Sequence, residues 1–255
     1  MLSQLFNSEK SAFFHVGKFI MWQKDIYKRP ENMSMYYKEI IRQMYDIGIG
    51  SLTIVVIISL FIGAVTAVQF SYQLSGGLIP DYYIGYVVRD MEIIELAATI
   101  TCLVLAGKVG SNMAAEIGGM RQKEHIDAME VMGVNTSAYI IMPKVIAAVI
   151  VIPILVSISA VVGIIGGFVA SVATGALTEE AYIKGLRSFF VPYNVLMMYV
   201  KAFVFAYILT SVSCYQGYFV KGGSIELGEA STRAVVYSDI LILVADFIIA
   251  LVLTV

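Results

Sequence analysis

The sequence predicts an all-α integral membrane protein. Three observations carry the prediction. Of its 255 residues, 59% are hydrophobic and only 14% charged, whereas a soluble domain has roughly 25% charged residues. The mean hydropathy is +0.82, and five apolar stretches are long enough to span a bilayer, which takes ~20 residues. With a net charge of −2, nothing suggests nucleic-acid binding.

The five predicted spans form one domain over residues 47–255. They are residues 47–73, about 85–107, about 140–173, about 192–215 and 236–255. The third stretch is too long for one straight crossing and contains Pro143 and Pro153, so we expect a kink or a start in the membrane interface.

The distribution of basic residues predicts the orientation. If the N-terminus is cytoplasmic, the inner segments contain thirteen of the seventeen Lys and Arg residues: seven in 1–46, four in 108–144 and two in 216–235. The outer loops contain three, and Lys201 lies inside a span. We therefore expect a cytoplasmic N-terminus and a C-terminus on the opposite side.

Residues 1–46 precede the first span and mix aromatic side chains with Lys and Arg. The apolar runs here are too short to cross a membrane. This composition predicts one or two amphipathic helices that lie in the cytoplasmic interface, with Pro30 as the break between them. A soluble cytoplasmic tail is the alternative.

Residues 106–135 lie between the second and third spans and are unusually polar for this chain. Gly118–Gly119 predicts a break or bend in the helix that leaves the membrane. A short helix should follow and end at Gly133, a residue suited to a C-terminal cap. Its apolar stripe lies beside an acidic one: Ile126, Met129 and Met132 beside Glu124, Asp127 and Glu130. The pattern fits a partner-docking helix and, equally, a solvated loop helix.

The same stretch carries a resemblance. The run over residues 106–134, AGKVGSNMAAEIGGMRQKEHIDAMEVMGV, resembles the signature of the MlaE/YrbE permease family. Three further blocks are similar to that family in the same order: IIRQMYDIGIGSLTIVVIISLFIGAVTAVQ, PKVIAAVIVIPILVSISAVVGIIGG and ELGEASTRAVVYSDILILVADF. The sequence departs from the pattern at Lys108, which replaces Arg, at His125, which replaces Gln, and at Ile94, where the family has Arg before Glu95.

The resemblance implies the permease of an ABC lipid transporter associated with MCE proteins. It implies a homodimer in the inner membrane that works with two ATPase subunits, a periplasmic ring of MCE domains and often a small STAS-domain protein, with phospholipid as cargo. The segment at about 118–133 would be the coupling helix that docks on the ATPase. The candidate coupling residues are Glu116, Arg121, Glu124, Asp127, Met129, Glu130 and Met132.

The resemblance also implies a lipid cavity at the dimer interface, bordered by the first, second and last spans. One face of the first span, with residues at three- and four-residue spacing, is the candidate lipid contact. It consists of Phe61, Val65, Val68, Gln69 and Tyr72. Core packing or plain contact with bilayer lipid would explain the same spacing. Gln69 favours an interior position, because an amide facing lipid is costly.

Three charged residues fall near the middle of their spans. At a rise of ~1.5 Å per residue, Glu95, Lys201 and Asp246 lie at similar depth. An isolated charge there costs ~2.5–3.5 kcal/mol, so the three should face the protein interior and pair. Either a static bridge that fixes helix packing or a latch that re-pairs during transport fits this pattern.

The sequence argues against catalysis by this chain. The nucleotide-binding pattern G-x-x-x-x-G-K-[ST] is not met at Gly107–Lys108, because Val109 follows and position 102 is Cys. We therefore expect no cofactor here, with ATP and magnesium bound by a partner ATPase. Two distant histidines, His15 and His125, do not suggest a metal site. The competing hypothesis is an ion- or proton-coupled secondary transporter that uses the intramembrane charges.

Overall fold

The computed structural model describes residues 12–26, 33–74 and 80–254, and helices make up nearly all of them. Most elements are α-helices, and the second span also contains two π-helical segments. The elements are α1 (Ala12–Ile26), α2 (Met33–Leu74), α3 (Tyr82–Met91), η2 (Glu92–Leu96), α4 (Ala97–Leu105), η3 (Ala106–Gly110), α5 (Ser111–Gln122), α6 (His125–Val131), α7 (Thr136–Ala173), α8 (Glu179–Arg187), α9 (Pro192–Tyr218) and α10 (Ser224–Thr254).

Five helical segments are long and apolar enough to cross a membrane, which confirms the predicted fold class. They are Tyr36–Leu74, Tyr82–Gln122, Thr136–Ala173, Pro192–Tyr218 and Ser224–Leu253. The second is composite and runs from α3 to α5 through η2 and η3. A π-helical turn takes in one more residue than an α-helical turn, so each π segment changes which side chains face a neighbouring helix.

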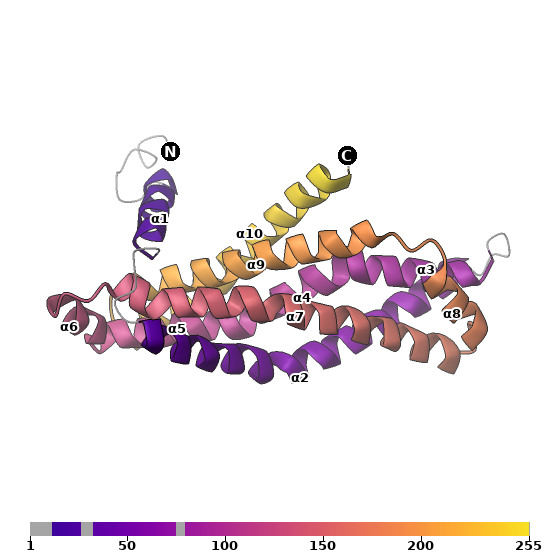
Figure 1. The fold of residues 1–255 in the computed structure, drawn as a ribbon, viewed down its shortest axis with the longest axis horizontal. Helices are drawn as coiled ribbons and strands as arrows, with labels where there is room; N and C mark the ends of the chain where they lie inside the picture. Colours follow the sequence, from indigo (N-terminus) through magenta and orange to yellow (C-terminus); the bar gives the residue numbers. More distant parts are fainter. Residues whose placement is uncertain (1–11, 27–32, 75–79, 255) are drawn as a thin grey trace.

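The helices form an elongated bundle (Figure 1). The short helix α6 lies at one end, and α3 and α8 lie at the other. The most extensive packing joins α2 to α7, which run side by side along the bundle. The last helix, α10, packs on α9 and α5, and its C-terminal part diverges from the rest of the bundle (Figure 1).

Small residues allow α2 and α7 to approach closely. A Cβ atom on Gly63 of α2 would overlap the backbone carbonyl of Gly163 of α7, and a Cβ on Gly166 would overlap the carbonyl of Leu60. Small residues at helix crossings are typical of membrane bundles, where packing rather than the hydrophobic effect holds helices together. The contact is extended by a 2.7 Å hydrogen bond between the Ser59 and Ser159 hydroxyls.

The third span is one helix of 38 residues that continues through both Pro143 and Pro153. At ~1.5 Å per residue it is much longer than a hydrocarbon layer of ~30 Å. The prolines therefore do not divide it into two helices, and the helix extends beyond the hydrocarbon layer. Its start is capped by the Asn135 side chain, which accepts a 3.3 Å hydrogen bond from the Ala138 N–H.

The N-terminal region contributes α1, which packs against α7. The Trp22 ring of α1 is buried and meets the Tyr215 ring of α9 at a centroid distance of 5.4 Å. Helix α2 runs without a break through residues 46 and 47. The predicted break at Pro30 lies outside the described residues. The division at residue 46 between an interfacial segment and the span domain stays a prediction.

Arg89 of α3 fastens α3 to the segment that follows α8. Its Nη1 donates to the carbonyl oxygens of Leu186 at 2.6 Å and Ser188 at 2.8 Å. Its Nη2 donates to the carbonyl of Phe189 at 3.3 Å and pairs with Asp90 at 2.7 Å. Arg89 is 3% exposed. This one buried side chain therefore satisfies three backbone carbonyl groups at the end of the bundle that contains α8.

Candidate functional site

The helix that leaves the second span does not break at Gly118–Gly119. Helix α5 continues to Gln122, and the chain turns at Lys123–Glu124, where Glu124 has φ 59°. The predicted break is therefore wrong, and the bend that was its alternative stays a prediction. Gly118 is a packing position instead, because a Cβ there would meet the Leu227 side chain and the Gly217 carbonyl. Close contact with α9 and α10 offsets the weak helix propensity of glycine.

Helix α6, from His125 to Val131, ends as the sequence predicts. Gly133 adopts φ 81°, in the left-handed region. Its N–H donates to the Glu130 carbonyl at 3.0 Å, and the Val134 N–H donates to the Met129 carbonyl at 3.1 Å. These two bonds form a Schellman cap, which fixes the direction of the chain before α7.

Two of the three acidic residues proposed for docking face their own chain. The Arg121 guanidinium lies 2.9 Å from the Asp127 carboxylate and 3.5 Å from that of Glu130. Glu130 also accepts a 2.9 Å hydrogen bond from the Tyr218 hydroxyl of α9. Of the three, Glu124 is exposed and forms no ion pair with the described residues. The pairs of Arg121 hold the α5–α6 turn against α9.

The predicted apolar stripe of α6 is divided between the interior and the surface. Ile126 is fully buried, and Met129 packs against the main core. Met132 is 71% exposed, and its neighbour Val131, which the sequence analysis did not single out, is 90% exposed. At 3.6 residues per turn, Val131 and the capping residue Met132 lie about 120–140° around the helix axis from Ile126, so they point to a different side. Val131 and Met132 are thus the outward apolar pair.

Glu116, the remaining coupling candidate, pairs with Lys144 of α7. The two charged groups are 2.6 Å apart, and the Lys144 side chain is 3% exposed. A buried ammonium is costly without a partner, so Glu116 stabilises Lys144 and links α5 to α7.

The three intramembrane charges meet in the structure. The Lys201 ammonium of α9 lies 2.6 Å from the Glu95 carboxylate of η2 and 2.6 Å from the Asp246 carboxylate of α10. Lys201 is fully buried, whereas the Glu95 side chain is 39% exposed. The Thr99 hydroxyl donates to Asp246 at 3.2 Å. The cluster joins three helices, and Glu95 has one side toward the outside of the chain.

A further acidic residue of the second span, Glu92, was not predicted from the sequence as a site residue. It is 1% exposed, and its carboxylate lies against Gly163 of α7, where no Cβ occupies the space. Its Oε1 has no hydrogen-bond partner among the described residues. The signal was present in the sequence, because Glu92 lies three positions before Glu95 in the same span, and any acid in a span is a candidate for a special role.

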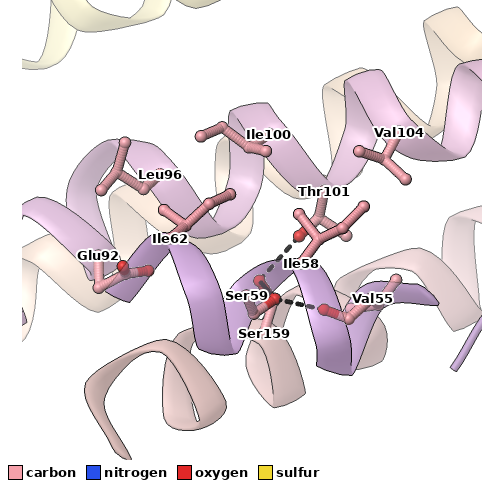
Figure 2. Close-up of a pocket in the computed structure, with 10 residues that line it drawn as sticks. All are labelled: Val55, Ile58, Ser59, Ile62, Glu92, Leu96, Ile100, Thr101, Val104 and Ser159. Atoms are coloured by element: carbon pink, nitrogen blue, oxygen red, sulfur yellow. Dashed lines mark hydrogen bonds between the residues drawn. The ribbon is translucent and has the colours of Figure 1, made fainter. Parts of the chain in front are cut away.

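Figure 2 shows Glu92 beside a chain of hydroxyl groups. Thr101 donates to Ser159 at 2.8 Å, the Ser159 and Ser59 hydroxyls are 2.7 Å apart, and Ser59 donates to the Val55 carbonyl at 2.7 Å. These bonds leave no hydroxyl donor for Glu92. The cavity that these residues line has a volume of about 10 Å³, which is room for about one water molecule.

The candidate lipid-contact face of α2 points away from the core of its own chain. All five residues are exposed, and the exposure of the other four besides Gln69 ranges from 41% for Val68 to 84% for Tyr72. On the opposite face of the same turns, Gly63 and Ala67 are buried. Packing in the core of this chain is therefore excluded as the reason for the spacing, and the face meets bilayer lipid, cargo or another chain.

The fold and the site together define a polytopic membrane protein of the transporter type. It has five membrane-spanning helices, a buried ion cluster that joins three of them, and a capped short helix between the second and third spans. Residues 40–252 match the family model described as Permease MlaE. The chain belongs to the MlaE permease family. It is thus the non-catalytic permease subunit of an ABC transporter.

The relatives agree along nearly the whole chain. A probable ABC transporter permease protein of Rickettsia bellii is 36% identical over 92% of this chain and 90% of that protein. The intermembrane phospholipid transport system permease protein MlaE of Haemophilus influenzae is 30% identical over 84% of this chain and 82% of its own length. Protein TRIGALACTOSYLDIACYLGLYCEROL 1, chloroplastic, of Arabidopsis thaliana is 30% identical over 85% of this chain and 61% of that protein.

Proposed function

We propose that this permease moves phospholipid between the inner and outer membranes, driven by ATP that a separate subunit hydrolyses. The family match over residues 40–252 carries the proposal, together with the name of the Haemophilus influenzae relative as an intermembrane phospholipid transport permease. The exposed apolar face of α2 supports it, because lipid tails need an apolar surface beside the protein.

The proposed assembly is a homodimer of this chain with two ATPase subunits, a periplasmic ring of MCE domains and, in the form often found with the family, a STAS-domain protein. ATP and magnesium belong to the ATPase. The location is the inner membrane. The Lys and Arg bias supports a cytoplasmic N-terminus and a periplasmic C-terminus, which puts α6 on the cytoplasmic side and α8 on the periplasmic side.

In this orientation α6 is the coupling helix. The surface that would meet the ATPase consists of Glu124, Val131 and Met132, which point outward. Arg121, Asp127 and Glu130 act indirectly, because their ion pairs hold α6 at a fixed angle to α5 and α9. A rigid connection is what allows movement of the ATPase to move the spans.

The cluster of Glu95, Lys201 and Asp246 has two candidate roles in transport. As a static bridge, it fixes α9 and α10 against the second span. As a latch, it re-pairs when the lipid cavity opens and closes. The 39% exposure of Glu95 supports the latch, because the outward side of this carboxylate is open to a second partner from outside the chain.

The function is tested with the whole co-expressed complex in proteoliposomes. Fluorescent phospholipid should pass to acceptor vesicles only when ATP is present and the ATPase is active. We expect Glu124 to face a basic groove on the ATPase. Glu124→Lys should therefore weaken ATPase co-purification and slow transfer, because a like-charge contact at an interface costs several kcal/mol. Transfer that needs no ATP, or an undiminished ATPase yield with Glu124→Lys and Met132→Asp together, would contradict the proposal.

The same preparation separates this proposal from a secondary transporter, which the buried charges alone would also fit. Under that alternative, transport would follow an imposed proton or sodium gradient and stop with an ionophore. ATP-driven transfer that continues with the ionophore present excludes it.

A further inference from the structure

A large cleft lies between α2 and the second span at the end of the bundle that contains α5. Its volume is about 810 Å³, and most of its polar lining comes from α2, η3 and α5. Its chemically distinctive residues are Asp46, Ser51, Lys108, Asn112 and Ser231. The cleft does not overlap the ion cluster or the α6 surface, so none of the roles described above accounts for it.

The depth of the cleft matches a layer of lipid headgroups. Lys108 follows Glu95 by thirteen residues (108 minus 95) in one composite helix. At ~1.5 Å per residue this is roughly 20 Å along the span. If the ion cluster lies at mid-depth, Lys108 is beyond the hydrocarbon boundary at ~15 Å and within the headgroup region, which extends to ~20–22 Å. A soluble ligand of the cytoplasm would have no need of this depth.

The charges of the cleft match a headgroup that carries both signs. The Lys108 ammonium donates to the Gly50 carbonyl of α2, and an ammonium has further N–H donors to offer. Asp46 lies one helical turn from Gly50, is exposed and lines the same cleft. The other acid there, Glu116, is already paired with Lys144. A phosphate beside Lys108 and an ammonium beside Asp46 would give each of these charged side chains a partner of opposite charge.

Two further observations indicate that the cleft is built to hold a polar ligand. Ser51 is fully buried and lines the cleft, yet its hydroxyl has no hydrogen-bond partner among the described residues. Buried hydroxyls are rarely left unsatisfied. Lys108 also lies in the π-helical segment η3, and π-helical turns are frequent at functional sites.

We propose that this cleft binds the headgroup of a zwitterionic phospholipid from the cytoplasmic leaflet, with Lys108 on the phosphate and Asp46 on the headgroup ammonium. The proposal rests on the proposed function. It adds the site at which the protein binds lipid on the cytoplasmic side. The acyl chains would extend from the cleft along α2 and the apolar residues of α4 that lie nearer the middle of the span.

The test is photocrosslinking in the complete complex. A benzophenone amino acid at Asn112, which is exposed and lines the cleft, is activated in vesicles of equal phosphatidylethanolamine and phosphatidylglycerol. We expect lipid adducts enriched in phosphatidylethanolamine. Lys108→Gln should reduce the adduct yield about tenfold, as loss of one charge-assisted hydrogen bond implies, and Lys108→Arg should retain it. Asp46→Asn should remove the preference between the two lipids.

A label at Ile154 of α7, which is 53% exposed, is the control, because its contact with lipid should not depend on Lys108. An adduct of a second copy of this chain at Asn112 would overturn the proposal, as would a yield insensitive to Lys108→Gln. Suppression by inorganic phosphate would show a site for free phosphate instead. ATP-driven lipid transfer by the same vesicles reports on the proposed function separately, so failure of the site leaves that result intact.

Discussion

Gly63 and Gly163 meet backbone to backbone where α2 crosses α7. A Cβ atom on Gly63 would overlap the carbonyl group of Gly163, so the crossing depends on the missing side chain rather than on an attractive contact. We expect Gly63→Ala to force the two longest helices apart and to destabilise the permease by a few kcal/mol. Gly228→Ala in α10, where nothing lies within 4 Å, is the control. Thermal unfolding in detergent should separate the two, and equal unfolding temperatures would contradict the close crossing.

Removal of Lys201 alone should destabilise the permease more than removal of Lys201 together with Asp246. Lys201→Ala leaves Glu95 and Asp246 facing each other near mid-membrane, and loss of one member of a buried pair often costs about 3–5 kcal/mol. Lys201→Ala with Asp246→Ala should recover part of this loss, because less charge is stranded. A double mutant that is destabilised by the sum of the single changes would show that the residues are not coupled. Recovered stability without lipid transfer would favour the latch over the static bridge.

Substitution by Met should change the unfolding temperature in opposite directions at Glu92 and at Glu95. Glu92→Met removes a buried carboxyl group that lacks a partner among the described residues and keeps the length of the side chain, so we expect the unfolding temperature to rise by several degrees. Glu95→Met removes a partner of Lys201 and should lower it. If Glu92→Met is instead destabilising, Glu92 has a stabilising partner in the working complex.

Arg89 should control the order of the segment after α8. Arg89→Ala leaves the carbonyl groups of Leu186, Ser188 and Phe189 without this donor, and a hydrogen bond to a charged group contributes about 1.5–3 kcal/mol. We expect faster amide hydrogen exchange from the end of α8 to residue 190. Arg187→Ala alters an exposed arginine of the same segment and should leave exchange unchanged. Equal effects of the two changes would contradict a specific role for Arg89.

Met132 and Ile126 should separate docking from folding. Met132→Asp places a charge on the outward end of α6 and should reduce co-purification of the ATPase without changing the unfolding temperature, because the side chain is 71% exposed. Ile126→Ala should lower the unfolding temperature, because Ile126 is fully buried and Ile→Ala in a core costs about 2–5 kcal/mol. Loss of stability with Met132→Asp would show that Met132 belongs to the core.

The sequence predicts the features that the membrane itself constrains. Hydrophobic length determined the five spans, and the cost of charge at depth predicted the meeting of Lys201 with Glu95 and Asp246. Packing determined what could not be predicted. In the sequence Gly118 suggests a helix break, whereas in the structure it is the position at which α5 packs closely against α9 and α10. Helix α6 ends at Val131, so the helical spacing between Met129 and Met132 does not put both side chains on one face. The role of Glu92 depends on the space beside Gly163, which no pattern in one span reveals.

The two π-helical segments of the second span, η2 and η3, have a consequence for how this family varies. A π turn amounts to one inserted residue that a helix has absorbed without breaking. Deletion of a single residue within Glu92–Leu96 or Ala106–Gly110 would therefore convert the turn to an ordinary one, leave the helix intact and keep every later side chain on nearly its present face. Alignment gaps of one residue belong in these two places. Lys108 lies within η3 itself, so the register of that turn sets the direction in which its side chain points.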